Sequence, residues 1–449
     1  MALNSSSAVA PGNTALTPVA EADRLFGWRD HAALWFSLGV GLLVMQVGAY
    51  LTPALGLREA LPVIVAGSLL GAGLLAWTAR LGTDSGLSSA GLMHATYGRG
   101  FARLPVVLNI VQLIGWTTFE LVVMRDGTVA IADRMFGDAA GGAAGAATSA
   151  NTGTNTGAVV LATLAWGGVL ALLLAGSMVR LVRRLVGRIG LPLVVLSLAW
   201  LSWQFLGQAQ AKGWATLWNT PGQGGMGSLQ ALDLVIAMPV SWLPLVADFS
   251  RHGRSGAGAL RGTWLGYALA NTWCYALGVL VALAAPTEDL VGALLLAQGG
   301  LIALGLILID EADNAYGDLY AGAVAGHSLR PRWGVRGWGL GLAALSTALA
   351  LVLPMHSLEP FLLMLSSVFV PLYGVILGRL GVARGAGSPG GPIRPIQPLD
   401  RFIEPRAAAL WLGGIALYHG LAQAAPQFGA ALPTLAATFV LAALTRPKA

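Results

Sequence analysis

Charged residues are scarce in this chain. Asp, Glu, Lys and Arg make up 10% of its 449 residues, against about a quarter in soluble globular proteins. Hydrophobic residues make up 56%. This composition excludes a soluble globular chain and predicts a protein that crosses a membrane several times. The apolar runs do not alternate with polar residues, so a transmembrane β-barrel is excluded as well.

Cysteine is almost absent. The one cysteine, Cys274, lies in an apolar segment, which excludes a disulfide framework and a thiolate metal site. The six histidines show no metal-ligand spacing. The glycine-rich stretch 82–91 lacks the lysine of a phosphate-binding loop, so nothing predicts an ATP-driven protein. Residues 1–22 lack the basic start and short apolar core of a cleaved signal peptide.

The apolar residues form twelve segments long enough, or nearly so, to cross a membrane. They are about 33–57, 61–81, 104–124, 158–179, 189–207, 229–247, 263–285, 290–325, 338–354, 358–380, 407–425 and 430–445. Alternate loops between them, together with the two terminal stretches, hold 22 of the 26 basic residues. This asymmetry predicts an integral protein of a bacterial-type inner membrane with both termini cytoplasmic. It also accounts for the net charge of +6 without a nucleic-acid partner.

Composition also divides the chain. Residues 1–28 are predicted to form a disordered cytoplasmic tail, and 29–380 a transport core of ten segments. The Gly/Pro-rich stretch 381–406 is predicted to be a cytoplasmic linker, followed by two peripheral segments and the C-terminus in 407–449. The low-complexity stretch 138–157 is predicted to be an external loop.

The eighth segment places acidic and amide side chains where a membrane helix normally has hydrocarbon. These side chains are Asp310, Glu311, Asp313, Asn314 and Asp318. At 100° per residue their positions fall on one arc of the helix surface. A carboxylate at mid-membrane costs roughly 2.5–3.5 kcal/mol. The arc is therefore expected to face the protein interior, a wet cavity or a cation. The alternative is that these residues lie beyond the membrane edge.

Two other segments carry helix-breaking residues. The first has glycines on both sides of Gln46, and the sixth has Pro239 and Pro244 flanking Ser241 and Trp242. Freed backbone groups in a membrane need a partner. Interruptions in corresponding helices of two repeats point to a mid-membrane substrate site in an inverted-repeat transporter. The alternative is that membrane helices tolerate Gly and Pro without any ligand nearby.

The third segment places Gln112, Trp116 and Glu120 four residues apart, so they share one helix face. An indole with a carboxylate one turn away could stack a flat heterocycle and hydrogen-bond its edge. A carboxyl group suits a 4-aminopyrimidine, which shows an amino donor beside a ring nitrogen. The alternative is that Trp116 packs against a neighbour and Glu120 bonds a backbone carbonyl.

Three runs carry a family resemblance: NIVQLIGWTTFE, SWLPLVADFSRHGR and DEADNAYGDLY. They resemble the nucleobase–cation symporter-1 family, which includes purine and cytosine permeases, and most of all its hydroxymethylpyrimidine transporter branch. The resemblance implies an all-α polytopic membrane protein of the leucine-transporter type. Such a fold has twelve transmembrane helices: ten in two inverted five-helix repeats and two peripheral ones. It also implies alternating-access transport driven by Na⁺ or H⁺.

The resemblance further implies which residues bind. Trp116 matches the stacking tryptophan, and the other substrate-binding candidates are Gln46, Gln112, Glu120, Met238, Pro239, Ser241, Trp242, Asn314 and Asp318. The ion-site positions match Leu42, Met45, Ile309, Ala312 and Asp313. Ala312 and Asp313 stand where the family has hydroxyl residues, which leaves Na⁺ and H⁺ open.

The function predicted from the sequence is a secondary active importer, not an enzyme, with no cofactor besides the coupling cation. The best substrate is 4-amino-5-hydroxymethyl-2-methylpyrimidine, a thiamine precursor; cytosine or another nucleobase or purine is the alternative. Besides this pyrimidine and the cation, membrane lipid is the only partner predicted. Two other classes fit less well. An intramembrane aspartyl protease needs two aspartates on facing helices, and a channel pore favours a ring of like residues.

Overall fold

The structure is a computed structural model. It describes residues 15–136, 156–176, 189–285, 290–353, 355, 358–382 and 396–446. Within these ranges every regular element is a helix, apart from one isolated bridge between Phe26 and Gly253. Eight of the described helices are long and apolar enough to cross a membrane. A ninth span is formed by two shorter helices that meet at an angle of 61°.

The twelve predicted segments each correspond to a helix or to a pair of helices in the described chain. The spans are α1 (Trp28–Ser37) with α2 (Leu42–Tyr50), α3 (Leu57–Ser85), α5 (Arg103–Phe136), α6 (Thr156–Leu174), α8 (Leu191–Lys212), α10 (Ser228–Ser241) with α11 (Leu243–Ser250), α12 (Gly256–Ala284), α13 (Leu290–Leu296) with α14 (Gly300–Leu329), α15 (Val335–Val352), α16 (Leu358–Ile376) with η4 (Leu377–Gly381), α18 (Pro405–Ala424) and α19 (Ala431–Leu444). Short helices add η1 (Glu21–Asp23), α4 (Ser89–Tyr97), α9 (Trp214–Asn219) and η5 (Pro426–Phe428).

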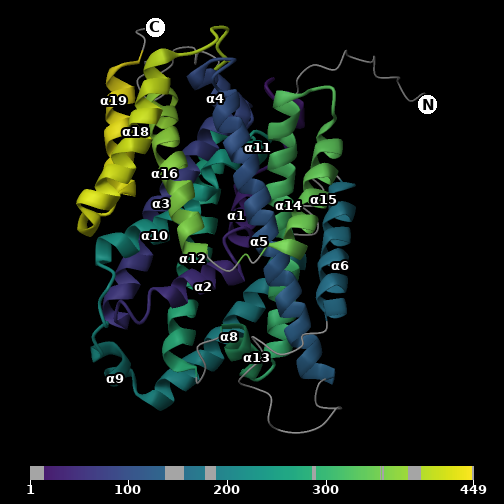
Figure 1. The fold of residues 1–449 in the computed structure, drawn as a ribbon, viewed down its shortest axis with the longest axis vertical. Helices are drawn as coiled ribbons and strands as arrows, with labels where there is room; N and C mark the ends of the chain where they lie inside the picture. The colour runs from purple at the N-terminus through teal and green to yellow at the C-terminus, as the bar shows by residue number, and fades with distance from the viewer. Residues whose placement is uncertain are drawn as a thin grey trace, which may run out of the picture.

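The spans pack as two groups. One group contains α1, α2, α3, α10, α11 and α12, and the other contains α5, α6, α14 and α15. Small residues permit the close approach of α2 to α12, because a Cβ at Gly48 would meet the backbone of Tyr275. Figure 1 shows α5 and α14 side by side, with α15 and α6 next to them. The first and sixth spans therefore lie in one group, and the third and eighth in the other.

The last two spans, α18 and α19, form a hairpin at one edge of the molecule and pack on α16 (Figure 1). Polar contacts fasten both ends of the hairpin. Asp233 on α10 accepts hydrogen bonds from the backbone N–H groups of Ala430 and Ala431 at the start of α19. At the other end, Arg379 in η4 and Glu404 at the start of α18 form a buried ion pair of 3.1 Å.

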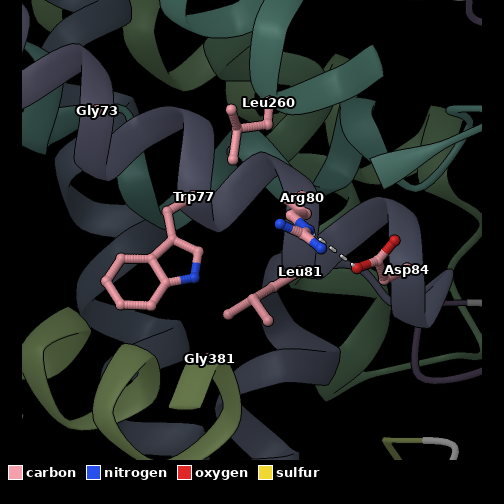
Figure 2. Close-up of a pocket in the computed structure, with 7 residues that line it drawn as sticks. All are labelled: Gly73, Trp77, Arg80, Leu81, Asp84, Leu260 and Gly381. Carbon is pink, nitrogen blue, oxygen red and sulfur yellow. Dashed lines mark ion pairs between the residues drawn. The ribbon is translucent and has the colours of Figure 1, made fainter. Parts of the chain in front are cut away.

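A cavity of about 460 Å³ lies between α3, α12 and η4. Figure 2 shows the indole of Trp77 beside Gly381, with Arg80 directed toward Asp84. The guanidinium of Arg80 and the carboxylate of Asp84 are 3.5 Å apart. A second cavity of about 700 Å³ lies between α10, α16 and α18. None of the substrate or ion residues predicted from the sequence lines either cavity.

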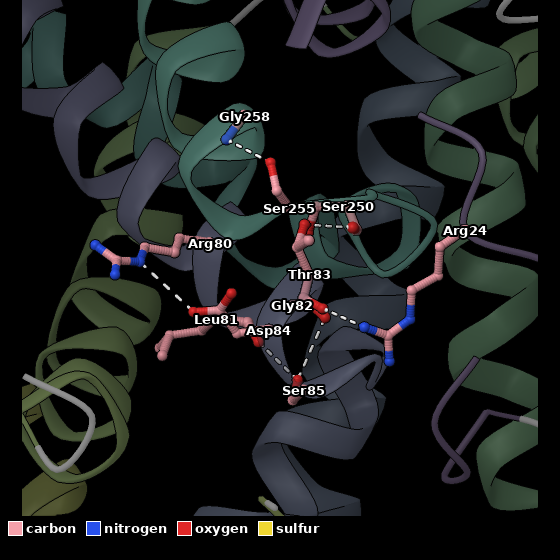
Figure 3. A network of polar contacts seen from close by, with 10 residues as sticks. All are labelled: Arg24, Arg80, Leu81, Gly82, Thr83, Asp84, Ser85, Ser250, Ser255 and Gly258. Atoms are coloured by element: carbon pink, nitrogen blue, oxygen red, sulfur yellow. Dashed lines mark hydrogen bonds and ion pairs between the residues drawn. The ribbon is translucent and has the colours of Figure 1, made fainter. Parts of the chain in front are cut away.

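The predicted disordered tail, residues 1–28, differs from the structure in its second half. Residues 1–14 lie outside the described residues, whereas the chain from Ala15 onward is held at the end of α3. Arg24 donates hydrogen bonds to the carbonyl of Thr83 (3.1 Å) and to that of Val19 (3.2 Å). Figure 3 shows Arg24 reaching this end of α3, where Thr83 also donates to the Ser250 carbonyl at 2.6 Å.

The same N-terminal segment also reaches the turn between α11 and α12. Phe26 is buried, and its backbone N–H donates to the carbonyl of His252 at 2.9 Å. Its own carbonyl accepts from the N–H of Arg254 at 2.9 Å. These contacts are mostly to backbone atoms, so they leave no pattern in the composition of the segment. The predicted external loop 138–157 lies outside the described residues except for its last two.

Candidate functional site

The first span is interrupted between Ser37 and Leu42, where α1 and α2 meet at 61°. Two glycines in the interruption have no room for a side chain. A Cβ at Gly39 would lie 2.9 Å from the Cβ of Ala270, and one at Gly41 would lie 3.0 Å from an oxygen of Glu311. The glycines thus allow the interruption to lie directly against α12 and α14.

Polar side chains of α14 satisfy the backbone groups that this interruption frees. The N–H of Leu42 donates to Glu311 Oε1 at 2.5 Å. Asn314 donates its side-chain amide to the carbonyl of Val40 at 2.9 Å. The prediction that the acidic arc faces the protein interior is borne out for these residues, since Asp310, Glu311, Asn314 and Asp318 are all buried.

The sixth span is interrupted less sharply than its proline content suggests. α10 ends at Ser241 and α11 begins at Leu243, so only Trp242 lies between them. The two helices form one continuous span and are not among the bent pairs. Here α5 supplies the partners. Asn109 donates to the carbonyl of Pro244 at 2.9 Å, and Gln112 to that of Ser241 at 3.2 Å.

Trp116 and Glu120 lie on the buried face of α5, as the four-residue spacing predicts. The indole of Trp116 is only 6% exposed and meets the ring of Phe361 nearly edge-on at 5.2 Å. Glu120 is 3% exposed. It lies close enough to Asp318 on α14 for the two carboxyl groups to interact electrostatically. The third and eighth spans therefore present their acidic groups to each other.

Several buried polar atoms in this region have no hydrogen-bond partner within the described residues. They are Gln112 Oε1, Trp116 Nε1, Glu120 Oε2, Asp310 Oδ2, Asp313 Oδ2, Asn314 Oδ1 and Asp318 Oδ2. Six of these seven atoms are oxygens. Buried polar groups in proteins are normally paired, so this region is rich in unpaired carboxyl and amide oxygens. It is suited to a ligand that brings hydrogen-bond donors or positive charge.

Other predicted substrate residues have their polar groups occupied. The hydroxyl of Ser241 donates to the carbonyl of Met238 at 2.7 Å, and the amide nitrogen of Asn314 is used on the first span. Met238 and Pro239 are buried in α10, and Gln46 is half-buried on α2. Trp242 packs edge-on against Trp35 at 5.9 Å. Ser241 and Asn314 therefore have fewer free donors than the sequence suggested.

The predicted ion residues lie on two elements that contact each other, Leu42 and Met45 on α2 and Ile309, Ala312 and Asp313 on α14. Leu42 and Met45 lie in the first turn of α2, where carbonyls serve as helical acceptors. The side chain of Ile309 is 62% exposed, whereas Ala312 is buried. Asp313 interacts with the hydroxyl of Ser37. Among the described residues, no three His, Cys, Asp or Glu side chains are arranged to hold a metal ion.

The structure adds polar residues that the sequence did not single out. Ser37, the last residue of α1, donates to Asp310 at 2.7 Å. Asn109 precedes Gln112 by one turn of α5 and accepts a hydrogen bond from it at 2.9 Å. In the sequence, Asn109 lies three residues before Gln112 and so continues the helix face of Gln112, Trp116 and Glu120. This spacing is the sequence pattern that could have predicted its place in the site. Nothing in the sequence distinguishes Ser37.

Residues 18–296 match the family model described as permease for cytosine/purines, uracil, thiamine, allantoin. The chain belongs to this permease family. It is therefore a transporter, not an enzyme, as predicted. A comparison with curated proteins found no match.

Solved structures agree on the fold of this permease. It is similar to Mhp1, a nucleobase-cation-symport-1 family transporter in a closed conformation with bromovinylhydantoin bound, at 15% identity and a TM-score of 0.77, covering 97% of this chain and 94% of that one. It is also similar to an inward-facing conformation of Mhp1, at 16% identity and a TM-score of 0.74. That match covers 98% of this chain and 93% of the other. A Na⁺-coupled sialic acid symporter matches at 10% identity and a TM-score of 0.59. That match covers 95% of this chain and 90% of the symporter. The predicted twelve-helix fold with two inverted repeats is confirmed.

Proposed function

We propose that this permease imports an aminopyrimidine by alternating access, with 4-amino-5-hydroxymethyl-2-methylpyrimidine as the best candidate. The observation that carries the proposal is the set of unpartnered acceptor oxygens around Glu120 and Asp318, beside the indole of Trp116. An aminopyrimidine brings an amino group with two N–H donors and a ring nitrogen that can be protonated. Both match an acceptor-rich pocket.

Cytosine or another nucleobase is the second candidate, since the matched family model names cytosine and purines. A base with ring carbonyls needs protein donors opposite them. The amide nitrogens of Gln112 and Asn314 are both engaged with backbone carbonyls. Their remaining free atoms are acceptors. The arrangement therefore favours an amino-rich heterocycle over uracil or a purine with several carbonyls.

The coupling cation in this proposal is Na⁺ or H⁺, and it is transported with the substrate. The resemblance implied Leu42, Met45, Ile309, Ala312 and Asp313 as its ligands. The geometry supports a set shifted toward the end of α1. There Ser37 contacts both Asp310 and Asp313, and each of these carboxylates has one unpartnered oxygen. Oxygen-only surroundings suit a hard cation.

The experiment is uptake into proteoliposomes reconstituted with the purified protein. Radiolabelled 4-amino-5-hydroxymethyl-2-methylpyrimidine is offered with an inward Na⁺ gradient, an inward H⁺ gradient or neither, in competition with cytosine, uracil, hypoxanthine and thiamine. The proposal expects saturable uptake driven by one gradient and blocked best by aminopyrimidines. Stronger competition by uracil or hypoxanthine would overturn the substrate assignment. Counterflow from preloaded vesicles separates a carrier from a channel.

The predicted topology belongs to the same proposal: an inner-membrane location, both termini cytoplasmic, and a core of residues 29–380 with peripheral spans in 407–449. Its support is the uneven distribution of arginine. Fusing a periplasm-active reporter enzyme to the C-terminus should give an inactive reporter. An active one would reverse the orientation.

A further inference from the structure

Four backbone hydrogen bonds of a continuous helix would cross the interruption in the first span. In an α-helix each N–H donates to the carbonyl four residues earlier. Leu42 would donate to Leu38, Leu43 to Gly39 and Val44 to Val40, and Gly41 would donate to Ser37. The ends of α1 and α2 therefore leave a defined set of donors and acceptors in the middle of a membrane, where each needs a partner.

Glu311 takes one of these donors and lies beside a second. Its Oε1 accepts from the N–H of Leu42 at 2.5 Å, and the same carboxylate lies near the N–H of Leu43. The residue is 1% exposed, so the contact is shielded from water. A carboxylate at the start of α2 also interacts favourably with the positive end of that helix. The glycine at 41 leaves space for it, since a Cβ there would lie 3.0 and 3.3 Å from the two carboxylate oxygens.

Neighbouring side chains take the other backbone groups. Asn314, one turn further along α14, donates to the carbonyl of Val40 and also to Glu311, the latter at 3.3 Å. The sulfur of Cys274 on α12 lies against the N–H of Gly41. With these partners in place, the carbonyls of Leu38 and Gly39 are released from helical hydrogen bonding. They lie in the interruption directly after Ser37, whose hydroxyl donates to Asp310.

We propose that Glu311 is the positioning residue that keeps the first span interrupted. Its carboxylate accepts the amide hydrogen of Leu42, which would otherwise bond the carbonyl of Leu38, and so leaves that carbonyl available to the transported ligand and cation. Glu311 acts through the backbone and makes no contact with the substrate in this account. The link to transport rests on the proposed function, but the backbone role does not.

Cys274 provides a built-in reporter for this geometry. It is the one cysteine of the chain, fully buried and beside Gly41. The experiment measures the rate at which a membrane-permeable maleimide labels Cys274 in the folded protein, for wild type, Glu311→Gln and Glu311→Ala. Glu59→Gln, on the exposed start of α3, is the matched control, and Cys274→Ser sets the background.

The proposal expects labelling to rise with the number of carboxylate oxygens lost. Glu311→Gln keeps one acceptor and should label faster than wild type, and Glu311→Ala should label fastest, by about tenfold or more. Glu59→Gln should match wild type. Melting temperatures separate local opening from general destabilisation: the order must hold among variants that melt within a few degrees of each other. If Glu311→Ala does not fold, Glu311→Gln decides alone.

Equal labelling of Glu311→Gln, Glu311→Ala and wild type would overturn the inference. So would labelling that follows the melting temperature of each variant and not its number of acceptor oxygens. The measurement uses no substrate. A wild-type protein that fails to carry any pyrimidine would therefore contradict the proposed function and leave the role of Glu311 standing.

Discussion

Asn109 and Asn314 make equivalent hydrogen bonds on two different spans. Asn109 on α5 donates to the carbonyl of Pro244 in the sixth span, and Asn314 on α14 donates to the carbonyl of Val40 in the first, each at 2.9 Å. The third and eighth spans thus satisfy the backbone of the sixth and first spans. This is the relationship expected when two inverted repeats place corresponding helices around one centre.

The two asparagines give a paired prediction. Asn109→Ala and Asn314→Ala each leave a buried carbonyl without its donor, which costs about 1–3 kcal/mol. Asn314→Ala should reduce transport more, because the first span is the sharply interrupted one. The measurement is initial uptake rate together with the melting temperature of each variant. Equal loss of transport in both variants would contradict the special role of the first interruption.

Trp116 is predicted to supply stacking energy to the bound heterocycle. Replacing Trp116 with Ala should weaken aminopyrimidine binding by about ten- to a hundredfold, since stacking on an aromatic side chain contributes roughly 1–3 kcal/mol per base. Trp203→Ala, on the exposed face of α8, is the control and should bind like wild type. Equilibrium binding of the labelled pyrimidine to purified protein measures both. Unchanged affinity in Trp116→Ala would show that the bound heterocycle does not stack on this side chain.

The ion pair between Arg379 and Glu404 is predicted to hold the peripheral hairpin. Burial alone favours the neutral acid of Glu404, but the hydrogen bond and charge of Arg379 outweigh it and lower the pKa of this carboxyl below its ordinary value. The stabilisation is therefore present above a pH of about 4.3 and is lost as the pH falls through the lowered pKa.

Glu404→Gln should leave the buried Arg379 without its anionic partner, at a cost of about 3 kcal/mol. The melting temperature should fall at neutral pH, and its acid dependence near pH 4 should become shallower than in wild type. Glu59→Gln again serves as the exposed control. A melting temperature for Glu404→Gln equal to that of the control would show that the pair contributes no stability.

Arg24 is predicted to fasten the N-terminal segment to α3. Arg24→Ala removes hydrogen bonds to two backbone carbonyls and should lower stability by about 1–2 kcal/mol. Arg29→Ala changes an exposed arginine of the same region, whose guanidinium lies over the ring of Trp28, and should have little effect. Limited proteolysis near residue 24, with thermal unfolding, distinguishes the two. Equal resistance would argue against the fastening role.

The sequence predicted those parts of the molecule that depend on hydropathy and helix periodicity. Twelve spans follow from apolar runs, and the inward direction of Asp310, Glu311, Asn314 and Asp318 follows from their arc and the cost of exposing carboxylates to lipid. The pairing of Trp116 with Glu120 on one face follows from their spacing. Hydropathy and helix periodicity are properties of residues close together in the sequence, so a local stretch is enough to predict each of these features.

What the sequence could not predict depends on contacts between distant residues. Leu42 and Met45 were assigned to the ion site by resemblance, and this assignment stays a prediction; the interruption lies just before them, at residues 38–41. Gly39 and Gly41 mark the interruption in the sequence, but no local pattern encodes the contact of Glu311 with Leu42 that satisfies its backbone. The hydroxyl of Ser241 bonds Met238 within its own helix, and the ordered segment from Ala15 is held mainly through backbone atoms. None of these contacts follows from residue type alone.

In the proposed function, the acidic groups of α5 and α14 form one site that binds an aminopyrimidine. Equilibrium binding of radiolabelled 4-amino-5-hydroxymethyl-2-methylpyrimidine to wild type, Glu120→Gln and Asp318→Asn tests it most directly. Each substitution is expected to weaken binding by about tenfold or more, since each loses a hydrogen bond to a charged group. The loss of binding free energy in the double variant should be smaller than the sum of the two single losses, because the two carboxyl groups interact. Wild-type affinity in both single variants would contradict it.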